Sequence, residues 1–241
     1  MKYLNFVGSD GPLAPKDVAV MQREFPRWAE EMDGRGVRLL GRPLDLPQTA
    51  TTVRVHDGQM LVTDGPFVEA KEFIAGFGLF DCTDLDEAIE VAAKGPVSWF
   101  KAIEIRSFAG EPRLSEKASA FGRGEDGDAS PYALAVWMGG TQSAPSPGQA
   151  VMREIEAWRQ DLAARGLHIL GGTLDGADTA TTLRVRDGRT LLADGTFLKT
   201  GEFIADLDVV SCADRQHAIR LAATHPLARY HAIEVHPFEN G

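Results

Sequence analysis

The chain has 241 residues, a net charge of −10 and 44% hydrophobic residues, which is the composition of a soluble globular protein with room for two domains. No apolar run approaches the roughly 18 residues of a membrane span, and segment 1–7 is too short for a signal peptide, so we expect a cytoplasmic protein without membrane contact. The acidic balance disfavours a nucleic-acid partner, and no histidine, cysteine or glycine spacing predicts a metal site or a cofactor.

The first predicted elements are a strand at 3–7 and a helix that ends at Gly36, where a glycine can adopt the conformation of a helix C-cap. The helix has an apolar stripe with steps of three and four residues. Its members are Val18, Met21, Phe25, Trp28 and Met32.

A short strand at 37–40 precedes a predicted β-hairpin. Asp57 and Gly58 form a two-residue connection between β-forming runs at 51–56 and 60–63, which is a strong hairpin signal. The remaining elements are a long strand at 73–82, a helix at 85–94 and a last strand at 101–108.

The same series then repeats. Residues 36–108 recur as 166–238 at a constant offset of 130, and about 32 of the 73 paired positions are identical. The chain is therefore a tandem duplication. The predicted domains are 1–108 and 132–241, and the polar segment 109–131 is predicted to be a flexible linker between them.

The order of elements in each copy predicts an α+β fold. Each copy is expected to be a ferredoxin-like βαββαβ unit with an added hairpin. Helices in such a unit cover one face of the sheet, so the other face needs a partner. We expect the two uncovered faces to meet in an intramolecular pseudo-dimer.

Three segments resemble the YCII-related family, in its DGPF branch. They are TVRV-x-DG at 52–58, DGPF-x-E-x-KE at 64–72 and the I-E-x-R strand at 103–106. The resemblance implies a bacterial protein whose units pair as a dimeric α/β barrel, here within one chain. The second copy is degenerate, with Thr196 in place of Pro66.

Some members of this family carry a histidine–aspartate pair, with the histidine in the first helix. The corresponding positions here are Phe25 and Ile155, and neither helix contains a histidine. The activity that the family pair implies is therefore not carried over to this chain.

Strand alternation predicts a polar face on each copy. Arg54, Glu104 and Arg106 in the first copy correspond to Arg184, Glu234 and His236 in the second. One interpretation is a cavity between the sheets, lined by Arg54, Glu104 and Arg106, for a small anionic or polar ligand. The other is a structural ion pair between strands or across the seam of the pseudo-dimer.

The long strand differs between the copies. Gly76 and Gly78 become Asp206 and Asp208 on the same face. Glycines leave room and carboxylates fill it, so we expect any cavity to be unequal, with the first copy as the more open half. The alternative is drift of a solvent-facing surface.

The DGPF loop also has two interpretations. Asp64 is a candidate general acid or base, tuned by Glu69, Lys71 and Glu72. Alternatively, Asp64 caps a turn that Gly65 allows and Phe67 anchors. The second copy favours this structural role, because it keeps the aspartate and phenylalanine but has lost the counterparts of Glu69 and Lys71.

Two functions remain open. The first is proton transfer of the lyase, isomerase or dehydrochlorinase type, with Glu104 or Asp64 as the base and Arg54 or Arg106 stabilising the developing anion. The second is a regulatory or binding module with a protein partner, which the resemblance implies because genes of the family often lie beside alternative sigma factors. A cavity that joins Arg54 to Glu104 would favour the first function. A filled interface with an exposed apolar patch would favour the second.

Overall fold

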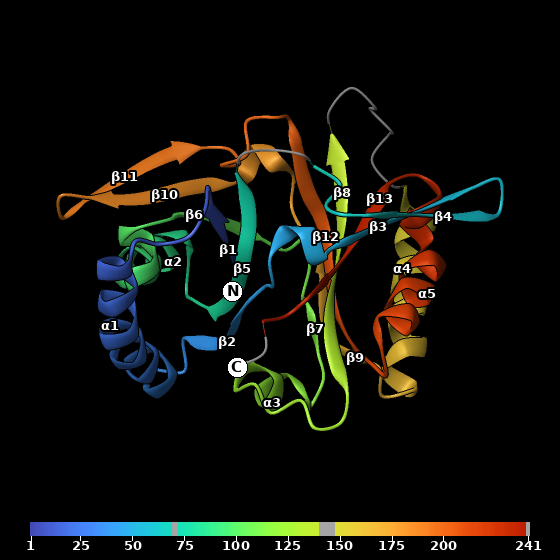
Figure 1. Ribbon diagram of the computed structural model, residues 1–241, viewed down its shortest axis with the longest axis horizontal. Coiled ribbons are helices and arrows are strands. Elements are labelled where there is room, and N and C mark those ends of the chain that lie inside the picture. The colour runs from blue at the N-terminus through green and yellow to red at the C-terminus, as the bar shows by residue number, and fades with distance from the viewer. Residues whose placement is uncertain (69–71, 140–147, 240–241) are drawn as a thin grey trace.

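The computed structural model describes residues 1–68, 72–139 and 148–239. Within these ranges, two antiparallel sheets lie face to face and helices cover the outer face of each (Figure 1). The helices are α1 (Pro15–Gly34), α2 (Leu85–Lys94), α3 (Ala118–Gly122), α4 (Gln149–Ala164) and α5 (Arg215–Thr224), with short 3-10 turns η1 (Pro47–Thr49), η2 (Pro96–Trp99), η3 (Ala177–Thr179) and η4 (Pro226–Arg229). The strands are β1 (Lys2–Ser9), β2 (Arg38–Pro43), β3 (Thr51–His56), β4 (Gln59–Asp64), β5 (Phe73–Asp81), β6 (Ala102–Ser107), β7 (Arg113–Leu114), β8 (Ser130–Gly139), β9 (His168–Thr173), β10 (Thr181–Arg186), β11 (Arg189–Asp194), β12 (Glu202–Cys212) and β13 (Ala232–Pro237).

Each copy has the strand order of a ferredoxin-like unit. Strands β6, β1, β5 and β2 are neighbours in that order, and β13, β8, β12 and β9 repeat it. The second helix of the first copy begins at a capping box. The Asp84 side chain accepts the N–H of Glu87 at 2.9 Å, and the Glu87 carboxylate accepts the N–H of Thr83 at 2.8 Å.

The hairpins are exchanged between the copies, which corrects the expectation that each hairpin extends its own unit. Strand β3 pairs with β13 of the second copy, with Val53 opposite Ile233, and β10 pairs with β6 of the first copy, with Leu183 opposite Ile103. In Figure 1 the two hairpins project to opposite sides, each over the helices of the other copy. The sequence of a hairpin specifies its turn and its alternation, but these do not determine which sheet edge it joins.

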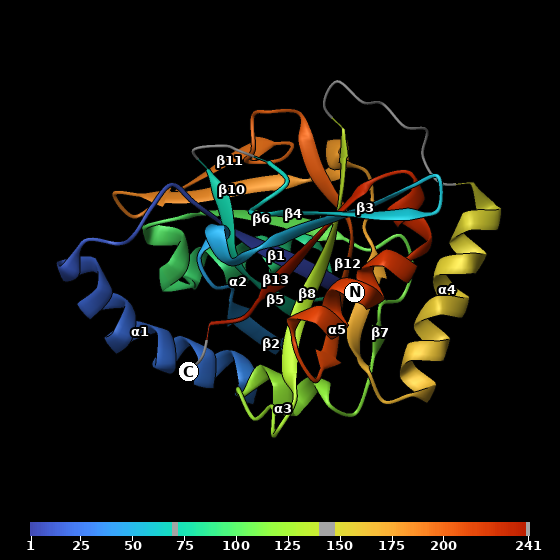
Figure 2. The ribbon, with the colours of Figure 1, turned by 45° about the vertical axis from the view of Figure 1, so that its right-hand side comes forward.

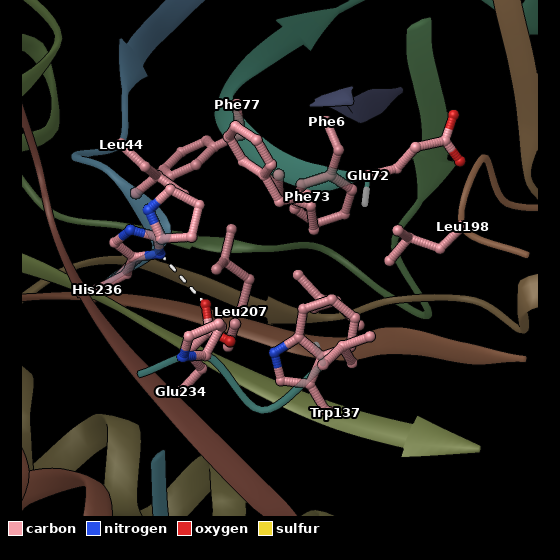
Figure 3. A pocket seen from close by; sticks show the side chains of 17 residues that line it. Phe6, Leu44, Glu72, Phe73, Phe77, Trp137, Leu198, Leu207, Glu234 and His236 are labelled. Atoms are coloured by element: carbon pink, nitrogen blue, oxygen red, sulfur yellow. Dashed lines mark hydrogen bonds and ion pairs between the residues drawn. The ribbon is translucent and has the colours of Figure 1, made fainter. Parts of the chain in front are cut away.

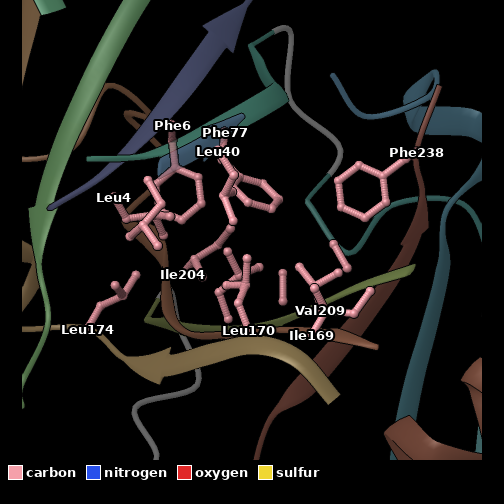
Figure 4. Close-up of a cluster of buried hydrophobic side chains, with 14 of the residues drawn as sticks. Leu4, Phe6, Leu40, Phe77, Ile169, Leu170, Leu174, Ile204, Val209 and Phe238 are labelled. Carbon is pink, nitrogen blue, oxygen red and sulfur yellow. The ribbon is translucent and has the colours of Figure 1, made fainter. Parts of the chain in front are cut away.

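The inner faces of the two sheets form one hydrophobic core. Leu4 and Phe6 of β1 lie opposite Leu170 of β9 and Val209 of β12 (Figure 4). Isolated bridges between Leu44 and Phe238, and between Phe108 and Leu174, link segments of the two copies. Each fully buried leucine or phenylalanine contributes about 1.5–3 kcal/mol, so this contact stabilises both units.

Segment 109–131 is not the uniform coil predicted for it. Strand β7 pairs with β9, and α3 lies against β2 (Figure 2). Phe121 of α3 is 2% exposed, and its ring centroid is 4.9 Å from that of Phe238. The polar composition of the segment concealed the few apolar side chains that fix it to the core.

None of the helices in the described ranges combines the length and apolar character that a membrane crossing requires.

Candidate functional site

Each copy's last strand carries a glutamate that binds the D-G-x-F loop of the other copy. The Phe67 N–H donates to Glu234 Oε2 at 3.0 Å, and the Phe197 N–H donates to Glu104 Oε2 at 3.1 Å. The hairpin exchange produces this arrangement, because β4 delivers the loop of one copy to the sheet of the other. The DGPF loop therefore has a structural role through its main chain.

These two contacts lie at two ends of the interface, which we call the first end, at Glu104, and the second end, at Glu234. At the first end, Glu104 is paired with a permanent cation. Arg106 is 0% exposed and donates through Nη1 to Glu104 Oε1 at 3.1 Å. Its guanidinium also donates to the carbonyl oxygens of Ile204 and Asp175. Burial raises the pKa of Glu104, although Arg106 and the Phe197 N–H act in the opposite direction. These contacts form an ion pair within strand β6, whereas the alternative predicted from the sequence was a pair between strands or across the seam.

At the second end, a histidine replaces the arginine. His236 Nδ1 lies 3.2 Å from Glu234 Oε1, and His236 Nε2 lies 2.9 Å from the carbonyl oxygen of Asp45. A carbonyl oxygen only accepts, so Nε2 must carry a proton. Nδ1 faces the carboxylate, so Glu234 and His236 are the counterpart of Glu104 and Arg106, with an imidazole in place of the guanidinium.

A small cavity between the sheets borders this second pair. Its volume is about 30 Å³, which is enough for one or two water molecules. Glu234 and His236 lie on one side of it, and Glu72 and aromatic and aliphatic side chains of both copies form the rest of the wall (Figure 3). Among the lining residues are Phe6, Pro66, Phe73, Phe77, Trp137 and Leu207.

A larger and more polar cleft lies beside this cavity, with Trp137 in the walls of both. The volume of the cleft is about 150 Å³, and it is lined by Arg54, Phe67, Trp137, Met138, Gly139, Glu202, Tyr230, His231 and Ala232. The guanidinium carbon of Arg54 stands 5.0 Å from the centre of the Phe67 ring, which is within the range of a cation–π interaction. Burial and the charge of Arg54 lower the pKa of His231, so this ring is neutral at pH 7.

The corresponding space at the first end is filled. Gly8 occupies the position of Trp137, since Gly8 pairs with Ala102 as Trp137 pairs with Ala232. The Phe197 ring lies directly over Gly8, where an added Cβ would be 2.6 Å from Cδ2 of the ring. Phe197 is 3% exposed, whereas Phe67 is only partly buried. The first end, with Gly8, is thus filled by the Phe197 ring, whereas the second end, with Trp137, borders the cavity and the cleft.

The expectation that the glycines of the long strand open the first half was wrong. Leu207 and Val209 face the core between the sheets, so Asp206 and Asp208 face the helices. Arg159 of α4 donates to Asp206 Oδ1 at 2.6 Å and to Asp208 Oδ1 at 2.8 Å. Asp206 and Asp208 do share one face of the sheet, as predicted, but this face is turned toward the helices and not toward the other sheet.

These aspartates and His225 have the spacing of a metal site, with their ligand atoms within 4.8 Å of one another. Arg159 Nη2 already contacts both carboxylates, at 2.6 and 3.1 Å. In addition, His225 Nδ1 accepts the N–H of Leu227 at 3.1 Å, which places the ring proton on the nitrogen that would have to bind a metal. The cluster is therefore an ion network with an arginine as its cation.

The hairpin exchange separates the residues that were predicted to form one cavity. Arg54 lies at the Glu234 end and not beside Glu104 and Arg106. Arg184 lies at the other end, where its Nη2 is 3.3 Å from Glu72 Oε1. Asp64 is at the surface, with 95% of its side chain exposed, 3.7 Å from Arg215. Glu69 and Lys71 lie outside the described residues.

Sequence reasoning missed Trp137, Tyr230 and His231 as site residues. Trp137 and Gly8 differ most in side-chain size between the two first strands, and an alignment of those strands would have shown the difference. Tyr230 and His231 gave no such signal, because their place in the site depends on the exchanged hairpin.

Comparison with known proteins agrees with the duplication. The YCII-related domain matches residues 1–108 and again 132–239. An "Uncharacterized protein R00369" of Rhizobium meliloti (strain 1021) is 50% identical over 48 residues, which are 20% of this chain and 39% of that protein. A solved structure, "Crystal structure of Putative Chlorite dismutase TA0507", is 9% identical, with a TM-score of 0.40 and coverage of 99% of this chain and 94% of that one. With two matched domains that together span most of its length, the chain belongs to the YCII-related family.

Proposed function

We propose that the chain binds a small molecule at the Glu234–His236 end of the interface and transfers a proton to or from it. One observation carries the proposal. Glu104 at the first end is paired with the permanent cation of Arg106, whereas Glu234 at the second end is paired with the imidazole of His236, and the small cavity borders the Glu234–His236 pair.

In this proposal Glu234 is the base. Its carboxylate lines the cavity, while the Phe67 N–H and His236 fix its two oxygens. A carbon acid in the cavity would lose a proton to Glu234. The resulting carboxyl group would then either return the proton to a neighbouring carbon, or keep it while a substituent leaves with its bonding electrons. This assignment replaces the predictions that Glu104 or Asp64 is the base, since Arg106 holds Glu104 and water surrounds Asp64.

The size of the cavity restricts the substrate. About 30 Å³ is far below the roughly 300 Å³ of a typical ligand pocket, so only a very small substrate is consistent with this cavity. The largely apolar wall favours a compact, mostly apolar carbonyl compound.

Exchange of carbon-bound hydrogen in D2O tests the proposal without knowledge of the natural substrate. The protein would be incubated with a panel of small carbonyl compounds, and deuterium uptake followed by NMR. We expect uptake in at least one compound and a loss of about 10²–10⁴-fold in Glu234→Gln, the usual contribution of a general base. Glu104→Gln is the matched control. Equal uptake in the wild type and in folded Glu234→Gln would refute the assignment.

The finer family assignment is part of the same proposal. Residues 64–67 support membership of the DGPF branch, and the bridges from Leu44 to Phe238 and from Phe108 to Leu174 support a barrel-like pairing of the sheets.

A protein-binding role is the second candidate, and the projecting hairpins favour it. Strands β4 and β11 are exposed along their whole length, and the apolar side chains exposed on them are Met60, Leu61, Val62, Leu191 and Leu192. The test is recovery of a sigma factor with the wild type but not with a Leu61→Asp, Leu192→Asp variant. Equal recovery with both would refute a role for the hairpins.

A further inference from the structure

His231 contributes an imidazole ring without a hydrogen-bond partner to the wall of the polar cleft. The residue is 7% exposed, and neither ring nitrogen has a partner within the described part of the chain. These nitrogens are also not among the unpaired atoms that water cannot reach, in contrast to Trp137 Nε1 and Glu202 Oε2. Buried polar groups are normally paired, with a ligand or with water where the chain offers no partner. The His231 ring is therefore open to whatever occupies the cleft.

The counterpart of His231 in the first copy is already paired. Lys101 occupies the corresponding position, 130 residues earlier. Its ammonium group donates to the carbonyl oxygen of Gly11 and lies 3.5 Å from Asp10 Oδ1. The first copy thus pairs this polar group within its own chain, whereas the second copy leaves an imidazole available to a ligand.

A permanent cation lies near this ring. The charge of Arg54 lowers the pKa of His231, so the guanidinium is within electrostatic range of the imidazole. A neutral imidazole donates one N–H, and a guanidinium has five N–H donors, so that Arg54 can serve more than one acceptor. The planar fork of a guanidinium matches the oxygens of a carboxylate or a phosphate. Together, Arg54 and His231 offer donors and positive charge to an oxyanion.

The carboxylate in the described wall of the cleft does not oppose an anion at His231. A carboxylate close to His231 would raise the pKa of the ring, but the shift comes from burial and Arg54, which both lower it. Glu202 therefore acts at a different part of the cleft. At the neighbouring Tyr230, the adjacent charge is again positive, since the guanidinium carbon of Arg229 is 5.5 Å from the centre of its ring. Arg229 itself is paired with Glu154.

We propose that the part of the cleft at His231 is a binding site for a small oxyanion, either a carboxylate or a phosphate. The anion would accept the imidazole N–H of His231 and lie beside the charge of Arg54. A volume of about 150 Å³ limits it to a phosphate or a short-chain acid. Neither Glu234 nor His236 belongs to the wall of this cleft, so the site does not depend on the proposed proton transfer.

The Cε1–H signal of His231 in a ¹H–¹³C spectrum reports directly on this binding. His231→Phe identifies the signal among those of the six histidines and removes the donor while keeping a ring. Inorganic phosphate, propionate and propionamide would be titrated separately at pH 7. Propionamide has the shape of propionate without its charge, and the comparison of phosphate with propionate identifies the kind of oxyanion. The backbone N–H signal of Ala232, which lines the cleft, gives dissociation constants for the wild type and the variants alike.

We expect phosphate or propionate to shift the His231 signal, with propionamide at least about tenfold weaker because it lacks the charge. A bound anion stabilises the imidazolium, so the better anion should also raise the pKa of His231 in an NMR titration. His231→Phe and Arg54→Met should each weaken binding of that anion by about tenfold or more, the loss expected when a hydrogen bond to a charged group is removed. Lys101→Met changes the corresponding position of the first copy and should leave binding unchanged.

Three results would overturn the proposal. The first is a His231 signal that no compound moves, which would mean that water alone occupies the cleft. The second is propionamide binding as tightly as propionate, since charge would then contribute nothing. The third is a loss of binding in Lys101→Met as large as that in His231→Phe, because the anion would then not bind at the cleft. If His231→Phe does not fold, His231→Gln serves for the assignment, and the compound series on the wild type still decides between these outcomes.

Discussion

The two ends of the interface share one frame, the hydrogen bond between a glutamate and the loop of the other copy, and they differ in the side chains around it. At both ends, a glutamate of the last strand accepts the N–H of a phenylalanine from the other copy, and the arginine or histidine beside it contacts a main-chain carbonyl oxygen. The first end has an arginine and a glycine where the second has a histidine and a tryptophan. The comparison indicates that this shared bond maintains the contact between the copies, whereas the side chains that differ accompany a filled first end and a second end with a cavity and a cleft.

The helix layers differ in the same way. In the first copy, Trp28 packs on Phe80 with ring centroids 6.0 Å apart, over the glycines of β5. In the second, Arg159 and the aspartates of β12 occupy that space. The space between the long strand and the helices is thus filled by apolar side chains in the first copy and by a buried ion network in the second.

Removal of the cation from this network should have the largest effect on stability. Arg159→Met removes the arginine charge that contacts both buried carboxylates, and breaking a buried pair in this way costs about 3–5 kcal/mol. Urea denaturation would measure the loss. Arg153→Met changes an exposed arginine of the same helix and should shift stability by less than about 0.5 kcal/mol. Similar losses for both variants would mean that the network does not stabilise the second copy.

Addition of a side chain at the closed end should have the next largest effect. In Gly8→Ala the new Cβ would lie 2.6 Å from the Phe197 ring, and overpacking of this kind costs about 1–3 kcal/mol. Gly34→Ala is a suitable control, because no atom lies within 4 Å of the added Cβ. If thermal unfolding shows Gly8→Ala to be as stable as the wild type, the end is less tightly filled than its geometry indicates.

Acid should weaken the second copy through Asp208. Burial alone would raise the pKa of this carboxyl, but Arg159 and His168 hold the pKa well below its ordinary value of 3.8. A depressed folded-state pKa gives stability that is present above the unfolded value and lost as the pH falls through the folded one. The free energy of unfolding should therefore decrease below about pH 4, and Asp208→Asn should flatten this decrease. An identical slope in both proteins would contradict the assignment.

The sequence was sufficient to predict the elements of each unit, but not the sheet edge that each hairpin joins. The repeat, the Asp-Gly turns and the helix predicted at 85–94 rest on local signals, and each corresponds to a feature of the structure. The partner of an exchanged hairpin is a long-range choice between two nearly identical sheet edges, and the sequence of the hairpin is compatible with either. The predicted cavity failed for this reason, because Arg54 was placed beside the wrong glutamate.

The site was predictable only where it depended on alternation within one strand. Glu234 and His236 were placed on the inner face, where they lie within hydrogen-bond distance of each other. The importance of Trp137 could not be recognised, because it depends on the position of Phe67, which arrives from the other copy. A residue whose role depends on contacts between the copies can be recognised only from the three-dimensional structure.

The smallest predicted effect concerns the loop sequence itself. The copies differ at Pro66 and Thr196, while both loops keep the phenylalanine N–H bond to a glutamate. Pro66→Thr should lower stability by only about 0.4–1 kcal/mol, because the main loss is the restriction that proline places on the unfolded chain. Thr196→Pro is the reciprocal test and should gain less, since the threonine Oγ1 donates to the carbonyl oxygen of Leu198 at 3.2 Å. Chemical denaturation of both variants would measure these changes. A loss of several kcal/mol in Pro66→Thr would mean that the proline positions the Phe67 N–H on Glu234, and the two ends would then differ in their frame as well as in their filling.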